Sequence, residues 1–89
     1  MKISKEKINK ISEQIIFFLY SNNPKSHFTS HIAKELARDE EFTKKLLLIL
    51  KKKNIVLEIK KNPSGENYIR RSRWKLSSEA YNFYKKRQL

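Results

Sequence analysis

The stretch FTSHIAKELARDEEFTKKLLLILKKKN, residues 28–54, contains two helical patterns separated by a short polar break. In the first pattern, four apolar side chains recur at helical spacing: Ile32, Ala33, Leu36 and Ala37. This spacing predicts a short helix with one buried face. A side-chain oxygen of Thr29 or Ser30 can accept hydrogen bonds from the amides of the opening turn, so we expect one of them to cap this helix.

The second pattern follows Asp39, a residue type suited to cap a helix. Glu40 and Glu41 come next, in the first turn, where the helix dipole favours negative charge. The side chains expected to face the core are Thr43, Leu46, Leu47 and Leu50. The lysines at 51–53 suit the last turn, and Asn54 can adopt the left-handed conformation that ends a helix. A short helix, a tight turn and a basic second helix form a helix-turn-helix plan.

A longer helix is predicted before this pair, from Ser4 to about Asn22. Its apolar stripe at helical spacing consists of Ile8, Ile11, Ile15, Phe18 and Leu19. Ile16, Phe17 and Tyr20 lie off that stripe, so the last two turns are apolar around most of their circumference. A helix of this kind usually packs against two neighbours, and one of them can be a second subunit.

A β-hairpin is predicted after the helix pair. Residues 55–60 alternate in the manner of a strand, residues 61–67 are rich in turn-forming types, and residues 68–76 return as a second strand. Ser77 is expected to cap a final helix that carries Ala80, Tyr81, Phe83 and Tyr84. The result is one mainly helical domain over residues 1–89, in the order helix, helix, helix, strand, turn, strand, helix. Residues 25–28 form a connector or a short additional strand.

Composition restricts the class of protein. Eighty-nine residues fit a single domain, and the absence of cysteine excludes disulfides and thiolate metal sites. The longest apolar runs, at 15–19 and 46–50, are far shorter than the roughly 18 residues that a membrane span needs. No signal-type segment opens the chain, and we therefore expect a soluble cytoplasmic protein.

Positive charge is concentrated in one half of the chain. The net charge is +12 overall, of which residues 1–41 contribute +1 and residues 42–89 contribute +11. A lysine-rich genome would explain part of the excess but not its asymmetry. We therefore interpret the asymmetry as one face of the protein suited to a polyanion such as nucleic acid.

The segments IAKELA (32–37), LLLILKKKNIV (46–56), NPSGENY (62–68) and RWKLSSEAY (73–81) resemble the winged helix-turn-helix transcriptional regulators of bacteria and archaea. The resemblance covers essentially the whole chain. It consists of core and turn residues, and so it indicates the fold more specifically than the function. Asn54 departs from the usual glycine, although asparagine tolerates the left-handed region better than most residues.

The resemblance implies DNA binding, with the second helix of the motif in the major groove and the wing along the backbone or minor groove. On that helix it assigns contacts to Lys44, Lys45, Leu48, Lys51 and Lys52. In the wing it assigns contacts to Lys60, Lys61, Asn62, Arg70, Arg71 and Arg73. Ser30 and Lys34, on the preceding helix, are expected to touch phosphate.

Leu48 stands where a polar base-reading side chain is common in this family. It can contact a thymine methyl group, or it can pack, with Ile49, against a partner protein. The groove-facing set of the helix also lacks Arg, Asn and Gln, which read guanine and adenine with paired hydrogen bonds. Lysine suits phosphate better, so we expect salt-sensitive affinity and modest sequence discrimination.

A homodimer is expected through the apolar residues that the core stripes leave over: Ile16, Phe17, Tyr20, Phe83 and Tyr84. The alternative to a DNA-binding regulator is a protein–protein interaction module of a larger nucleic-acid machine. RNA binding ranks third. Binding to an anionic membrane is not expected, because no helix combines a lysine-flanked polar face with an apolar face left free of the core.

We expect no enzyme activity and no cofactor. The sequence shows no nucleophile–base set and no phosphate-binding glycine loop, and nothing marks a small-molecule site. The carboxylates at 39–41 are explained by the start of a helix. His27 and His31 have the spacing of a metal pair on a helix, but the helix start expected between them breaks that geometry, and no third ligand is near.

Overall fold

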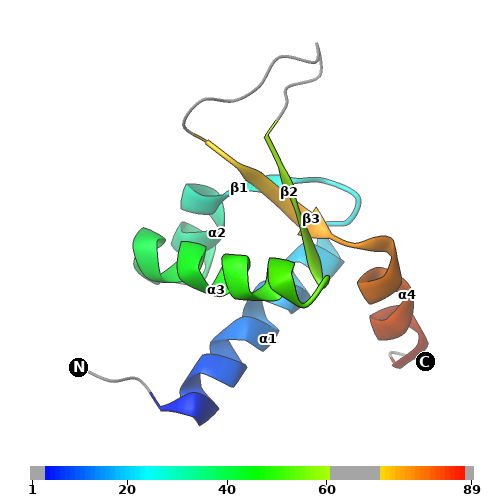
Figure 1. Ribbon diagram of the computed structural model, residues 1–89, viewed down its shortest axis with the longest axis horizontal. Coiled ribbons are helices and arrows are strands. Elements are labelled where there is room, and N and C mark those ends of the chain that lie inside the picture. Colours follow the sequence, from blue (N-terminus) through cyan, green and yellow to red (C-terminus); the bar gives the residue numbers. More distant parts are fainter. Residues whose placement is uncertain (1–3, 61–70, 88–89) are drawn as a thin grey trace.

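The computed structural model describes residues 4–60 and 71–87 (Figure 1). The elements, in chain order, are α1 (Lys5–Ser21), β1 (His27–Phe28), α2 (Thr29–Glu35), α3 (Glu40–Lys52), β2 (Val56–Ile59), β3 (Arg73–Leu76) and α4 (Ser78–Arg87). This order confirms the predicted mainly helical fold with a hairpin between the third and fourth helices. The connector before α2 does form a short strand, so the sheet has three strands.

The sheet is antiparallel, and β3 lies in its centre between β1 and β2. Val56 pairs with Leu76, and Glu58 with Trp74, so these four side chains share one face of the sheet. Val56, Trp74 and Leu76 are buried, whereas Leu57 on the opposite face is exposed. One face of the hairpin therefore closes the core, and the other face is left to the surface.

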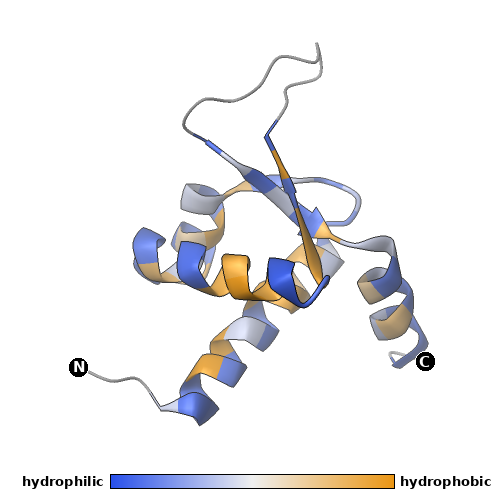
Figure 2. Cartoon of the chain, viewed as in Figure 1, coloured by the Kyte–Doolittle hydropathy of each residue, from blue (hydrophilic) through white to orange (hydrophobic). Residues whose placement is uncertain are grey.

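The core is formed where α1, α2 and α3 meet the inner face of the sheet. Its fully buried large side chains are Trp74, Ile11, Ile15, Leu19, Ile32, Leu47, Leu76 and Val56. Figure 2 shows the middle turns of α3 in orange between blue turns, which places its apolar segment halfway along the helix. The four side chains of α3 that the sequence assigned to the core, Thr43, Leu46, Leu47 and Leu50, are all buried.

The predicted starts of α1, α3 and α4 are confirmed by their caps. Ser4 Oγ accepts from the amide of Lys7 at 3.2 Å, and Asp39 Oδ2 accepts from the amide of Phe42 at 3.0 Å. Ser77 Oγ likewise accepts from the amide of the third residue of α4, at 3.0 Å. Each side-chain oxygen occupies an amide of an opening turn that the helix itself leaves unpaired.

The start and end of α2 differ from the prediction. Phe28 is the N-cap residue and its side chain makes no capping hydrogen bond, while Thr29 Oγ1 accepts from the indole Nε1 of Trp74 at 2.8 Å. The helix ends at Glu35, and Ala37 is exposed with a φ of 52°. The expectation that Ala37 lies on the buried face was therefore wrong.

The left-handed conformation predicted for Asn54 is confirmed, with a φ of 64°. It turns the chain from α3 directly into β2, and the amide of Ile55 donates to the carbonyl of Leu50 at 2.9 Å. The predicted turn at 61–67 and the first residues of the predicted second strand, 68–70, lie outside the described residues. β3 itself begins at Arg73.

Candidate nucleic-acid interface

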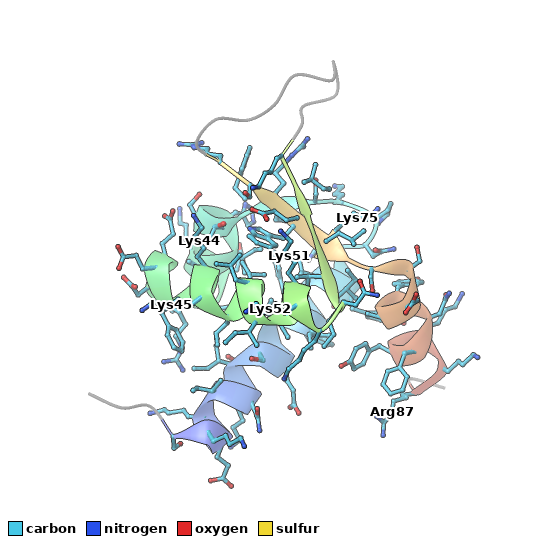
Figure 3. All side chains as sticks on the ribbon, in the orientation of Figure 1. Lys44, Lys45, Lys51, Lys52, Lys75 and Arg87 are labelled. Atoms are coloured by element: carbon cyan, nitrogen blue, oxygen red, sulfur yellow. The ribbon has the colours of Figure 1, made fainter. Side chains whose placement is uncertain are left out.

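The outward face of α3 is basic because burial of its apolar face fixes the rotation of the helix. With Thr43, Leu47 and Leu50 in the core, the lysines predicted for the groove, Lys44, Lys45, Lys51 and Lys52, are all exposed. Figure 3 shows these four lysines distributed along the length of α3. The helix thus presents a row of ammonium groups of the kind that neutralises phosphates.

Lys51 differs from its neighbours because an acidic residue compensates its charge. Its Nζ donates to Glu58 Oε1 at 2.7 Å, and Ser72 Oγ donates to the other oxygen of the same carboxylate. The Glu58 side chain is only 7% exposed. Burial alone would raise the pKa of this carboxyl, but hydrogen bonds from Lys51 and Ser72, and the nearby charges of Lys51 and Lys60, outweigh burial and lower the pKa.

This carboxylate ties α3 to the hairpin, and sequence reasoning did not identify it. The available signal was a single acidic residue within the strand pattern at 55–60. Its partner depends on the register that places Glu58 opposite Trp74, on the inner face of the sheet. Of the lysines predicted to contact DNA on α3, Lys51 is consequently the least available to a phosphate.

The described part of the wing places two of the predicted arginines on one aromatic ring. The guanidinium carbon of Arg71 lies 5.6 Å from the ring centre of Phe28, and that of Arg73 lies 5.9 Å from it. Both distances are within the range of cation–π attraction. Arg71 and Lys60 are exposed, whereas Arg73 is half-buried. The predicted contacts Lys61, Asn62 and Arg70 lie outside the described residues.

A small cavity of about 120 Å³ joins the helix pair to the wing. Its lining includes Ser30 at the start of α2, Lys44 on α3 and Arg71 at the base of the wing. Three residues that were predicted to contact DNA, each from a different segment of the chain, are therefore adjacent. Glu40 also lines this cavity and supplies one negative charge. Lys34, the other residue predicted on α2, is exposed but does not line this cavity.

Two apolar side chains of α3 are exposed beside its lysines. Leu48 is 41% exposed and Ile49 is 46% exposed. The structure therefore places both of them at the surface, as the helical period predicted.

A second surface, between α1 and α4, gathers four of the five residues predicted for a dimer interface; Phe83 does not line it. A groove of about 370 Å³ is lined by Glu13, Ile16, Phe17, Tyr20, Tyr84 and Arg87. Ile16 lines this groove but is buried and belongs to the core, so the expectation that it lies outside the core was wrong. Phe17, in contrast, is 63% exposed. The exposed ring of Phe83 contacts Tyr84 edge to face, with ring centres 5.2 Å apart.

His27 and His31 lie closer together than the sequence suggested, with ring centres 5.0 Å apart and the ring of Phe18 packed 4.9 Å from His27. Burial, followed by the nearby positive charges of His31 and Lys25, lowers the pKa of His27. Within the described residues, no group of three potential ligands could hold a metal ion. Over the same residues, no helix combines the length and the apolar character needed to cross a membrane.

No protein-family profile matches this sequence, and no curated protein matches it. Solved structures do match the fold. The Staphylococcus aureus MepR–DNA complex aligns with a TM-score of 0.75 at 18% identity, covering 93% of this chain and 65% of that one. A doubly substituted ZitR of Lactococcus lactis, in its apo form, gives a TM-score of 0.71 at 19% identity, covering 93% of this chain and 58% of that one.

NadR, in complex with 4-hydroxyphenylacetate, aligns with a TM-score of 0.64 at 21% identity and covers 91% of this chain and 60% of that chain. This chain thus spans less than two thirds of the length of these structures. These alignments establish that the present chain has the winged-helix fold.

Proposed function

We propose that this chain is a DNA-binding transcriptional regulator in which α3 enters the major groove and the β2–β3 hairpin lies along the backbone. The observation that carries the proposal is the convergence of Ser30, Lys44 and Arg71, from three separate elements, beside the row of lysines on α3. The MepR structure solved with DNA supports it, because its fold aligns with nearly the whole of this chain.

The affinity should come mainly from phosphate contacts. Each phosphate neutralised by a lysine or arginine contributes a slope of about −0.9 in a plot of log K against log salt concentration. About five such contacts per chain would give a slope near −4.5. Exposed cations in suitable positions are Lys34, Lys44, Lys45, Lys52, Lys60 and Arg71.

Binding to a fluorescent duplex of about 30 base pairs, three helical turns, tests the proposal across a salt titration. The Lys44→Ala/Lys52→Ala variant should bind more weakly and reduce the slope by about two. Lys85→Ala/Lys86→Ala, which removes the same charge from exposed positions on α4, is the matched control and should bind as the wild type does. Absence of binding even at low salt would refute the function.

The functional unit that we propose is a homodimer joined at the α1–α4 groove. Phe17 projects from the rim of an apolar groove, and burying it against a second copy would remove that surface from water. Phe17→Glu should sediment as a monomer, whereas Leu57→Glu, also an exposed apolar residue but on the outer face of the sheet, should remain dimeric. A dimeric Phe17→Glu variant would exclude this groove.

Protein–protein docking is the second candidate function, and the exposure of Leu48 and Ile49 on one helix favours it. In that case α3 would bind an apolar partner instead of DNA, and the DNA titration would show no salt-dependent binding. That the chain needs no small-molecule ligand stays a prediction, since the NadR structure holds 4-hydroxyphenylacetate.

A further inference from the structure

We propose that Leu48 determines sequence preference by contacting the C5-methyl group of thymine, so that α3 selects A·T base pairs through an apolar contact. The inference rests on the proposed DNA-binding function and deepens it. Leu48 lies on the outward face of α3, opposite the buried Leu46 and Leu50, and 41% of its surface is exposed.

The lysines around Leu48 place it at the centre of the basic row. Lys44 and Lys52 lie one helical turn before and after it, and both are exposed. At 1.5 Å per residue, these two lysines are about 12 Å apart along the helix axis. Lysine has a long, flexible side chain. Lys44 and Lys52 can therefore reach phosphates on either side of the point where Leu48 faces the bases.

Hydrogen bonds from α3 to base edges can come only from its lysines, which suit guanine, and from its first-turn glutamates. The helix contains no Arg, Asn or Gln, and its single hydroxyl, on Thr43, is buried and donates to the carbonyl of Asp39 at 2.8 Å. Glu40 and Glu41 can accept from the amino group of cytosine, but phosphate repels carboxylates. They occupy the first turn, so repulsion favours an approach through the middle and C-terminal half of the helix.

Leu48 belongs to the apolar segment 46–50 in the middle of α3. Figure 2 shows this apolar middle, and Figure 3 shows Lys44 and Lys45 before it and Lys51 and Lys52 after it. The thymine methyl is the apolar group that the major groove presents, and every other base edge there is polar. Removing water from the Leu48 side chain is therefore favourable in free energy only where that side chain contacts a thymine methyl group. The lysines on either side supply affinity, and Leu48 supplies discrimination between base pairs.

The test compares an A·T-rich duplex of about 30 base pairs with the same duplex in which deoxyuridine replaces thymidine. This replacement deletes the C5-methyl groups and preserves the base pairing and the phosphate charge. The wild type should bind the thymine duplex more tightly, by about fourfold for each methyl contacted. Leu48→Ala should bind both duplexes equally, with an unchanged salt slope because the lysines remain.

Ile49→Ala is the matched control, since Ile49 is a similarly exposed apolar residue of the same helix that projects about 100° away. It should retain the preference for thymine. Three outcomes would overturn the inference while DNA binding stands: equal wild-type binding to both duplexes, a preference that survives Leu48→Ala, or a preference lost in Ile49→Ala. Binding to neither duplex at low salt would instead refute the proposed function itself.

Discussion

The hydrogen bond between Trp74 and Thr29 joins the strand that leads out of the wing to the first residue of α2, and it allows a quantitative test of how the wing is held. Trp74 Nε1 donates to Thr29 Oγ1 at 2.8 Å, and the two residues are 0% and 8% exposed. Thr29→Val keeps the shape and β-branching of the side chain but removes the acceptor. The indole N–H is then left buried without this partner.

A buried donor that loses its partner costs about 1–3 kcal/mol. In a domain of this size, each kcal/mol lowers the melting temperature by about 4–8 °C. We therefore expect Thr29→Val to melt roughly 10 °C below the wild type. Thr29→Ser is the control, because it retains the hydroxyl acceptor and removes one methyl group, which is worth about 0.8 kcal/mol when fully buried.

Urea unfolding followed by tryptophan fluorescence measures both variants, since Trp74 is the only tryptophan of the chain. The m-value should stay constant if only the stability of the folded state changes. A loss of less than about 0.5 kcal/mol in Thr29→Val, half the usual net value of one hydrogen bond, would refute this role of the Trp74–Thr29 contact. Higher stability of Thr29→Val than of Thr29→Ser would also refute it, since burial of apolar surface would then outweigh the acceptor.

Three further predictions concern charge and backbone conformation. Glu58→Gln should destabilise the protein by about 1 kcal/mol at neutral pH by weakening the contact with Lys51. The pKa of Glu58 is lowered on folding, so its contribution to stability is complete above the ordinary pKa of a glutamate and is lost as the pH falls through the lowered pKa. The free energies of unfolding of the wild type and Glu58→Gln, measured by urea titration, should therefore converge in acid. The pKa of His27 is also lowered, which favours its neutral form, so wild-type stability should fall as the pH drops below 6.5. His27→Gln should show a flatter dependence of stability on pH. Parallel pH dependences of the two proteins would contradict this prediction. Ala37→Gly should be neutral or stabilising by up to about 1 kcal/mol in thermal melts. Glycine relieves the strain of the left-handed conformation at φ 52°, but it loses more chain entropy on folding. Ala33→Gly, in the buried face of α2, should instead destabilise the protein.

The sequence was sufficient for the starts of α3 and α4 and for the buried face of α3, because their determinants are local. Asp39 and Ser77 cap the helices that directly follow them, and the helical period identifies the four buried side chains of α3. The outward lysines of α3 follow from the same period. The candidate DNA-binding surface of α3 therefore consists of the residues that point outward when its predicted apolar face is buried.

The sequence was insufficient where a side chain has two possible partners and the better one lies far along the chain. Thr29 is suited to cap α2, but its hydroxyl accepts instead from Trp74, 45 residues away. The charge of Lys51 is compensated by Glu58 only because α3 lies against the inner face of the hairpin. Such contacts depend on the packing of elements, and residue types within a window cannot determine them.

The base of the wing is fixed to the rest of the domain by three contacts of different chemistry. Trp74 hydrogen-bonds to α2, Glu58 pairs with Lys51 of α3, and Arg71 lies over the ring of Phe28 in β1. Each contact joins the hairpin to a different element, so one loss leaves two in place. These contacts restrict the relative orientation of the hairpin base and α3. If the chain binds DNA as proposed, the conformational entropy of ordering these two elements is lost on folding and not on binding.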